Sequence, residues 1–293
     1  MHTNLNNAVK SSGSNTHNRG GNSGLAAVSN PQRAAALASQ GNVVRSNWNQ
    51  GNNNHCFHNK NWWVGRSFIG IGPYGWWGGW GYSPWLNYYP WSYWWGRPSW
   101  NSCVAFLPSY GWGNGYYYDY GPGGNVTYGN GQVAVDGQVV GTDAEYAQSA
   151  AELASVDPEE LKAVQPADWM ALGTFSMAVK DNEVDPARVI QIAVSKEGIV
   201  SGTIHNRTSG NTYTVQGRVD KETQRLAFTI GDDRNTVLET GIYNLTQDQT
   251  PLLCHFANGA RQTYMLVRLP EPEQKPEGAS DAATPVAPTV QER

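Results

Sequence analysis

The chain has 293 residues, a formal net charge of −4 and a high aromatic content, with 13 Trp and 15 Tyr against six Phe. Residues 1–118 hold seven Lys and Arg and no acidic residue, whereas the rest of the chain holds 13 basic and 24 acidic residues. Seven positive charges spread over 118 residues are too dilute for a nucleic-acid-binding stripe, so we predict no nucleic-acid partner. The opposite charges of the two halves favour self-association or binding to an anionic cell-wall polysaccharide.

The apolar runs of the sequence are all short. A membrane-spanning helix needs roughly 18 to 20 apolar residues in a row, and Gly, Pro, Asn and Ser interrupt every aromatic cluster well before that length. We therefore predict no membrane-spanning segment. The opening residues, Met1 to Asn4, begin a polar stretch in which no signal peptide is visible.

The first part of the chain is predicted to be largely without regular structure. Residues 1–29 are rich in Ser, Asn and Gly and bury too little apolar area to offset chain entropy, so we predict disorder there. A short helix follows at the start of a second segment, residues 30–118. Asn30 suits its N-cap, Pro31 suits its first position, and Gly41 can end it in a left-handed conformation.

Twelve of the 13 Trp residues lie between Trp48 and Trp112, where Gly and Pro interrupt both helical and strand periodicity. We expect an irregular layer of rings stacked on one another and on the β domain, with disorder as the alternative. Aromatic faces also stack on sugar rings, so an exposed carbohydrate-binding platform is a second hypothesis. The candidate platform residues are Trp62, Trp63, Trp76, Trp77, Trp80, Trp85, Trp91, Trp94, Trp95 and Trp100.

Residues 119–165 are predicted to form a small β-meander followed by short helices. Its three short strands are separated by an Asn-Gly pair and an Asp-Gly pair, the turn residues that two-residue hairpins favour. Thr142 and Glu145 have the spacing of a capping box, which predicts a helix through about Ser155.

Residues 166–269 have the clearest pattern, because apolar residues alternate between pairs of turn-forming residues. Tyr213, Val215 and Val219, for example, share one face of their strand. Eight strands with short antiparallel connections must hide their edges, which predicts a small up-and-down barrel, with a two-sheet sandwich as the alternative. The predicted fold class is therefore mainly β. The eight strands are expected at 172–179, 188–195, 199–206, 211–219, 224–230, 236–243, 251–257 and 262–269, and the tail at 270–293 is expected to be disordered.

The three cysteines suggest one disulfide. Cys56 and Cys103 flank the densest aromatic region, and a bridge between them would stabilise the fold by roughly 3 to 4 kcal/mol in the chain-entropy model. Free thiols in a reducing compartment are the alternative. Cys254 lies on a predicted strand and is interpreted as a small core residue.

The sequence contains no pattern typical of an active site. The segment His55 to His58 contains zinc and copper ligand types but no second closely spaced pair, so we predict no metal site and no cofactor. The acids of the β domain cluster in turns, and no carboxylate precedes Asp119. Glu239 and Arg268 lie mid-strand and are expected either to pair across the barrel or to face water. We therefore predict that the protein is not an enzyme.

Several sequence blocks occur in a distinctive order along the chain. They are Tyr118-Asp119-Tyr120-Gly121, Asn125-Val126-Thr127-Tyr128, Val135-Asp136-Gly137-Gln138, Glu145-Tyr146-Ala147, Trp169-Met170-Ala171-Leu172-Gly173 and Val219-Asp220-Lys221-Glu222-Thr223-Gln224-Arg225. Their order resembles a bacterial family of cell-surface proteins of the mu-protocadherin type, and the likeness covers roughly residues 30–269. The resemblance implies an extracytoplasmic location, in the envelope, at the surface or secreted, and a non-enzymatic role.

Three functions are compatible with these patterns. The first is a non-catalytic structural or interaction protein of the cell envelope or surface. The second is a carbohydrate-binding module that uses exposed Trp residues. The third is a barrel that carries a small ligand, which requires a cavity not filled by side chains such as Phe175, Phe228 and Tyr213.

Overall fold

The computed structural model describes residues 1–12, 31–50, 90–157, 159–160, 164, 168–179, 183 and 186–272. Its helical elements are α1 (His2–Ser12), α2 (Pro31–Gln50), η3 (Trp91–Trp94), α4 (Trp100–Phe106), η4 (Pro108–Tyr110), α5 (Asp143–Ala154) and η6 (Asn244–Thr246). Its strands are β1 (Val126–Gly129), β2 (Gln132–Val135), β3 (Gln138–Thr142), β4 (Trp169–Ala178), β5 (Arg188–Ser195), β6 (Ile199–Asn206), β7 (Thr212–Val219), β8 (Arg225–Ile230), β9 (Asp233–Gly241), β10 (Gln249–His255) and β11 (Arg261–Arg268). Among these helices, none is both long enough and apolar enough to cross a membrane.

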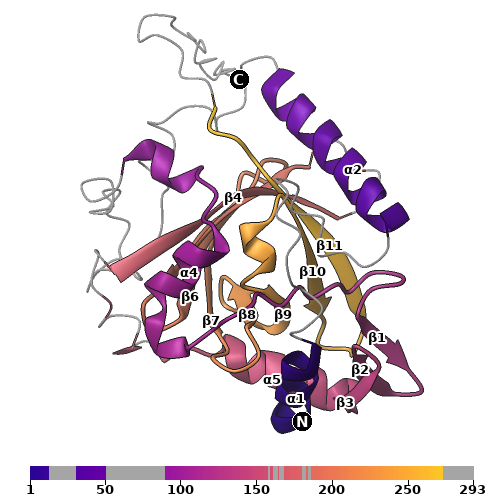
Figure 1. Ribbon diagram of the computed structural model, residues 1–293. Coiled ribbons are helices and arrows are strands. Elements are labelled where there is room, and N and C mark those ends of the chain that lie inside the picture. Colours follow the sequence, from indigo (N-terminus) through magenta and orange to yellow (C-terminus); the bar gives the residue numbers. More distant parts are fainter. Residues whose placement is uncertain are drawn as a thin grey trace, which may run out of the picture.

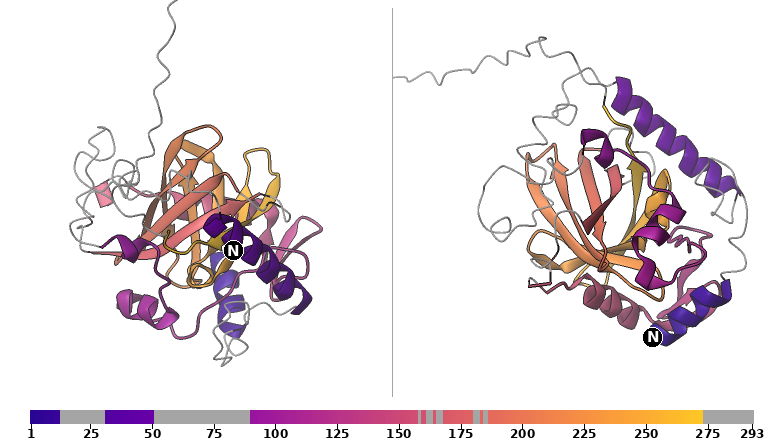
Figure 2. Two further views of the ribbon diagram at one scale, coloured as in Figure 1. Left: turned by 90° about the horizontal axis from the view of Figure 1, so that it is seen from above. Right: turned by 60° about the vertical axis from the view of Figure 1, so that its left-hand side comes forward.

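Strands β4 to β11 form one closed antiparallel barrel (Figures 1 and 2). Consecutive strands are neighbours, and pairing of β11 with β4 completes the ring. The predicted mainly β fold is confirmed, and the barrel is the correct alternative to the sandwich. Each of the eight strands lies within three residues of its predicted bounds, because the alternation of apolar residues and the turn pairs fix both the faces and the ends of the strands.

The interior of the barrel is apolar and filled with side chains over most of its length. Phe175 and Phe228 are fully buried there, among the inward-facing side chains of the other strands. Val215 and Val219 also point inward, which confirms the face predicted from their spacing. Aliphatic and aromatic side chains in this density make a packed core and leave no continuous channel along the barrel.

Two helices cover the outer wall of the barrel (Figure 1). Helix α5 packs Ala150 and Ala154 against Ala227 of β8 and Val237 of β9. These small side chains allow the helix to approach the strands closely. Helix α2 lies along β10 and β11 and belongs to an apolar cluster on another part of the wall.

Helix α2 is longer than the sequence predicted. It continues from Pro31 to Gln50, so the expected end at Gly41 is wrong. A Cβ atom at Gly41 would overlap the side-chain amide of Gln249 in β10. Because Gly41 has no side chain, helix α2 can approach the barrel closely at this position. Gly41 does not end the helix.

The prediction of disorder over residues 1–29 is wrong for His2–Ser12, which form α1. Leu5, Ala8 and Val9 have helical spacing, and they pack against the three-stranded sheet β1-β2-β3. This long-range contact supplies the burial that the local composition lacks. Residues 13–29 and most of the C-terminal tail lie outside the described residues, so disorder there stays a prediction.

The small β-meander has the predicted turns and the predicted helix after it. Asn130 and Asp136 have φ angles of 52° and 48°, and the glycine after each also has a positive φ, as two-residue hairpin turns require. Thr142 and Glu145 form the capping box at the start of α5, with the Thr142 hydroxyl accepting from the backbone N–H of Glu145 at 3.2 Å.

A buried ion pair lies on the outer wall of the barrel beneath α5. The Nε of Arg225 donates to Oε2 of Glu239 at 2.6 Å, and its other nitrogens donate to Oγ of Ser149 at 2.6 Å and to the carbonyl of Tyr146 at 3.0 Å. Burial alone would raise the pKa of Glu239, but the charge of Arg225 together with the contacts of His255 outweighs burial, and the pKa lies below its usual value. The predicted alternatives for Glu239 and Arg268 are both wrong, because Glu239 pairs with Arg225 and Arg268 lies inside the barrel.

Substitution of Arg225 tests this pair. Arg225→Met is expected to lower the free energy of unfolding by about 3 to 5 kcal/mol, since it leaves the charge of Glu239 buried and unpaired. The double variant Arg225→Met/Glu239→Leu should recover most of that loss, because it also removes the buried charge. Urea unfolding followed by circular dichroism measures both values.

A matched control is Arg218→Met. Arg218 pairs with Glu160 where both side chains are partly exposed, so its loss is expected to cost less than about 1 kcal/mol. Similar losses in Arg225→Met, Arg218→Met and the double variant would show that the buried pair has no special role.

Candidate functional site

The two ends of the barrel differ, because residues 96–118 cross one of them and form a cap. Tyr110 and Trp112 donate hydrogen bonds to carbonyls of the β5–β6 and β7–β8 loops at 2.8 and 2.6 Å. The side chain of Asn244, in the β9–β10 connection, exchanges two hydrogen bonds with the backbone of Tyr118. The cap is thus attached to all three hairpin connections at this end.

Apolar side chains of the cap enter the end of the barrel. Cys103 of α4 and Leu107 after it are fully buried and join the interior cluster. Trp100 stacks on Trp112 with ring centroids 5.6 Å apart and an interplanar angle of 20°. The side chains of Cys103 and Leu107 therefore occupy the barrel interior at the capped end.

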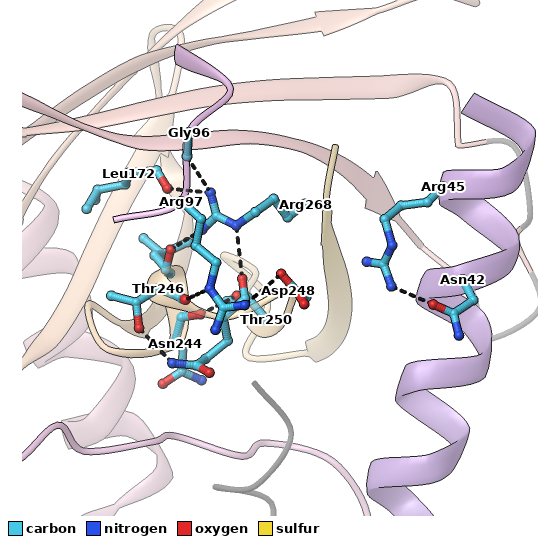
Figure 3. Close-up of polar contacts among 12 residues, drawn as sticks. Asn42, Arg45, Gly96, Arg97, Leu172, Asn244, Thr246, Asp248, Thr250 and Arg268 are labelled. Carbon is cyan, nitrogen blue, oxygen red and sulfur yellow. Dashed lines mark hydrogen bonds and ion pairs between the residues drawn. The ribbon is translucent and has the colours of Figure 1, made fainter. Parts of the chain in front are cut away.

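Arg268 seals the capped end from within (Figure 3). Its guanidinium lies 4.5 Å from the ring centre of Phe175. Burial lowers the pKa of this guanidinium to about 9, which leaves it charged at neutral pH. Its hydrogen bonds go to backbone carbonyls, those of Gly96 at 3.1 Å, Leu172 at 2.9 Å, Gln247 at 3.3 Å and Leu245.

Arginines of the acid-free half of the sequence pair with acids of the other half. Arg97 donates to the carbonyl of Thr246 at 2.7 Å and pairs with Asp248 at 3.2 Å (Figure 3). Arg33 of α2 donates from Nε to both carboxylate oxygens of Asp119, at 3.0 and 2.9 Å. Part of the charge asymmetry is therefore neutralised within a single chain.

The predicted aromatic platform is largely outside the described residues, and its described members pack inward. Trp94 and Trp95 are each 5 % exposed, and Trp95 contacts Trp48 with ring centroids 5.9 Å apart. Trp100 is partly buried in the cap. The rings of Trp94 and Trp95 have no free face for a sugar. Outside the described residues lie Trp62, Trp63, Trp76, Trp77, Trp80 and Trp85, and of Trp91 only the backbone is described.

Cys103 and Cys254 are both buried, and they are not bridged to each other. Burial raises the pKa of Cys103 to about 12 and that of Cys254 to about 11, so both stay protonated at neutral pH. The core position predicted for Cys254 is confirmed. Cys56 lies outside the described residues, as do His55 and His58, so the bridge from Cys56 to Cys103 stays a prediction. Within the described ranges, no three potential metal-ligand side chains gather in one place.

The end of the barrel opposite the cap contains a cavity of about 200 Å³, which we call the cup. Tyr213, at its edge, is 46 % exposed, so the cup opens to solvent. The apolar side chains that line it include Met177, Val179, Ile204, Leu238, Cys254 and Phe256. The polar side chains that line it are Arg188, Asn206, Tyr213, Thr236 and Tyr264.

The position of the cup follows from the filling of the barrel. Phe175 lies one inward position before Met177 in β4, and Phe228 lies one inward position before Ile230 in β8. The rings of Phe175 and Phe228 fill the interior below the cup. The cup is therefore a closed-bottomed cavity at the strand ends. Most of its lining residues belong to the strands, which hold their side chains in fixed positions.

Comparisons of the chain with family models, with curated proteins and with solved structures find no significant match. The resemblance to cell-surface proteins of the mu-protocadherin type accordingly stays a prediction. The candidate site rests on the geometry of the barrel alone.

Part of the cup was visible in the sequence. Alternation had placed Tyr213 on the same face of its strand as Val215 and Val219, and Tyr213 lines the cup. Arg188 and Tyr264 were missed as site residues, because nothing local distinguishes the open end of a barrel from the capped end. That distinction depends on where residues 96–118 pack.

Gly173 of β4 tests the sealing of the capped end. It has a φ of 131°, and a Cβ atom there would overlap the guanidinium of Arg268. Gly173→Ala is expected to destabilise the protein by about 1 to 3 kcal/mol through backbone strain alone. Thermal unfolding measures the loss. The control Gly129→Ala, in β1, places its Cβ in open space, and an equal effect of the two substitutions would contradict this account.

Proposed function

We propose that this protein is a non-catalytic binding protein whose barrel takes up a small, mainly apolar molecule in the cup. The observation that carries the proposal is the apolar cavity of about 200 Å³ at one end of a barrel whose other end is sealed. An engineered apolar cavity of roughly 150 Å³ in another protein binds benzene. The cup is therefore large enough for a single aromatic ring or a short hydrocarbon chain.

The titratable side chains of the cup favour binding over proton transfer. Burial raises the pKa of Cys254 to about 11 and also raises the pKa of Tyr264. Both groups keep their protons at neutral pH. A thiolate nucleophile or a general base would need a pKa near or below that pH.

The cell-surface or envelope location implied by the family resemblance is retained as part of this proposal. Self-association through opposite charges is less favoured, because Arg33 and Arg97 already pair with acids of the same chain. The carbohydrate platform is less favoured as well, since Trp94 and Trp95 bury their rings. A small-ligand barrel makes use of a cavity that the other two hypotheses leave without a role.

Filling the cup tests the proposal. Cys254→Phe, which places a ring in the cup, is expected to weaken the binding of a neutral aromatic probe, benzyl alcohol, at least roughly tenfold, because the ring occupies the same space. Isothermal titration calorimetry measures the affinity. Leu238→Phe fills the cup from another strand and serves as a second variant.

The control for an added ring is Val139→Phe, at a position in β3 that is 53 % exposed and far from the cup along the chain. It should leave the affinity unchanged. Absence of probe binding to the native protein, or binding that both filling variants leave intact, would refute the proposed function.

A further inference from the structure

We infer that the ligand of the cup carries one negative charge, and that Arg188 binds its carboxylate. The inference rests on the proposed function and adds a chemical class, a small aromatic or short-chain carboxylic acid. Among the described side chains that line the cup, Arg188 alone carries a charge at neutral pH.

Arg188 occupies the position from which a side chain can reach a ligand. It is the first residue of β5, and in the register of the sheet it lies between Met177 of β4 and Asn206 of β6. All three residues line the cup. The side chain of Arg188 is partly buried, so its charge is held beside an apolar wall.

The pairing of the other arginines sets Arg188 apart. In the described part of the chain, carboxylates pair with Arg33, Arg97, Arg218, Arg225 and Arg261. Arg45, Arg234 and Arg268 instead donate hydrogen bonds to neutral oxygen atoms of the protein. Arg188 forms no ion pair and no side-chain hydrogen bond with the described residues. A partly desolvated guanidinium without an anion is unfavourable, and a bidentate carboxylate would satisfy it.

Two described acids in or next to the loops at the open end of the cup, Glu183 and Asp233, are held by other groups. The carboxylate of Glu183 accepts a hydrogen bond from the backbone N–H of Val179 at 2.6 Å. The carboxylate of Asp233 accepts from the backbone N–H of Asn235 at 2.8 Å and from the side chain of Thr236. Neither acid is among the residues that line the cup. Among the described lining side chains, the guanidinium of Arg188 is therefore the charged group that a ligand would contact.

A neutral donor lies beside the guanidinium. The Oδ1 atom of Asn206 accepts from the backbone N–H groups of Thr208 and Ser209, at 2.9 and 3.4 Å. The amide nitrogen of Asn206 forms no hydrogen bond within the described residues. Guanidinium and amide together offer N–H donors and no acceptor to the ligand, which is the pattern that a carboxylate requires.

The test compares two probes of nearly the same shape, benzoate and benzamide, by isothermal titration calorimetry at pH 7. The native protein is expected to bind benzoate at least roughly tenfold more tightly, since a charge-assisted bidentate contact replaces a neutral one. Arg188→Met should remove this preference by weakening benzoate and leaving benzamide unchanged. Unchanged benzamide binding also shows that the cup of the variant is intact.

The control variant is Arg207→Met, in the neighbouring β6–β7 loop and outside the lining of the cup. It should preserve the preference for benzoate. Equal affinities for the two probes, or a preference that survives Arg188→Met, would overturn this inference and leave the proposed function standing. Failure of both probes to bind the native protein would overturn the two together. Tighter binding of the cation benzylammonium would assign the opposite charge to the ligand.

Discussion

The closed barrel depends on the pairing of β9 with β10, a seam that has fewer backbone pairs than any other two neighbouring strands of the barrel. Three residue pairs join these strands, against seven between β10 and β11. Glu239 lies opposite Leu253 in the seam, and its ion pair with Arg225 connects β9 to β8. Nε2 of His255, in β10, lies 3.5 Å from the second carboxylate oxygen of Glu239. Buried ionic groups are costly and are best known for fixing register, a role that suits a seam with few backbone pairs.

Closure of the sheet leaves two open ends, and the aromatic segment covers one of them. The carbonyls of hairpin loops accept hydrogen bonds, and the cap meets them with the indole N–H of Trp112 and the hydroxyl of Tyr110. Arg268 adds a guanidinium that also donates to carbonyls. A carboxylate in the cap would be repelled by the same carbonyl oxygens. The absence of acids from residues 96–118 is thus explained by capping.

The sequence predicted the barrel well because its information is local. Alternating residues such as Val215 and Val219, together with the turn pairs, define strands without reference to the rest of the chain. Features that depend on distant contacts were missed. Gly41 looked like a helix end and instead touches Gln249, and α1 gains its burial from the β1-β2-β3 sheet. The cup was partly predicted for the same reason. The shared face of a strand follows from local alternation, whereas the position of the cap depends on contacts with distant residues.

The polar side of the cup decides how selective such a site can be. An apolar wall distinguishes ligands that differ by one methylene by only about 1 to 3 kcal/mol, so the walls alone would accept many small hydrophobic molecules. A partly buried donor discriminates more strongly, because a ligand that lacks the matching acceptor leaves it desolvated and unpaired. Arg188 and Asn206 lie side by side on β5 and β6 and are therefore held at a fixed spacing by the sheet. Selection of the ligand in this barrel thus depends on the charge of Arg188, while the apolar walls of the cup limit the size of the ligand.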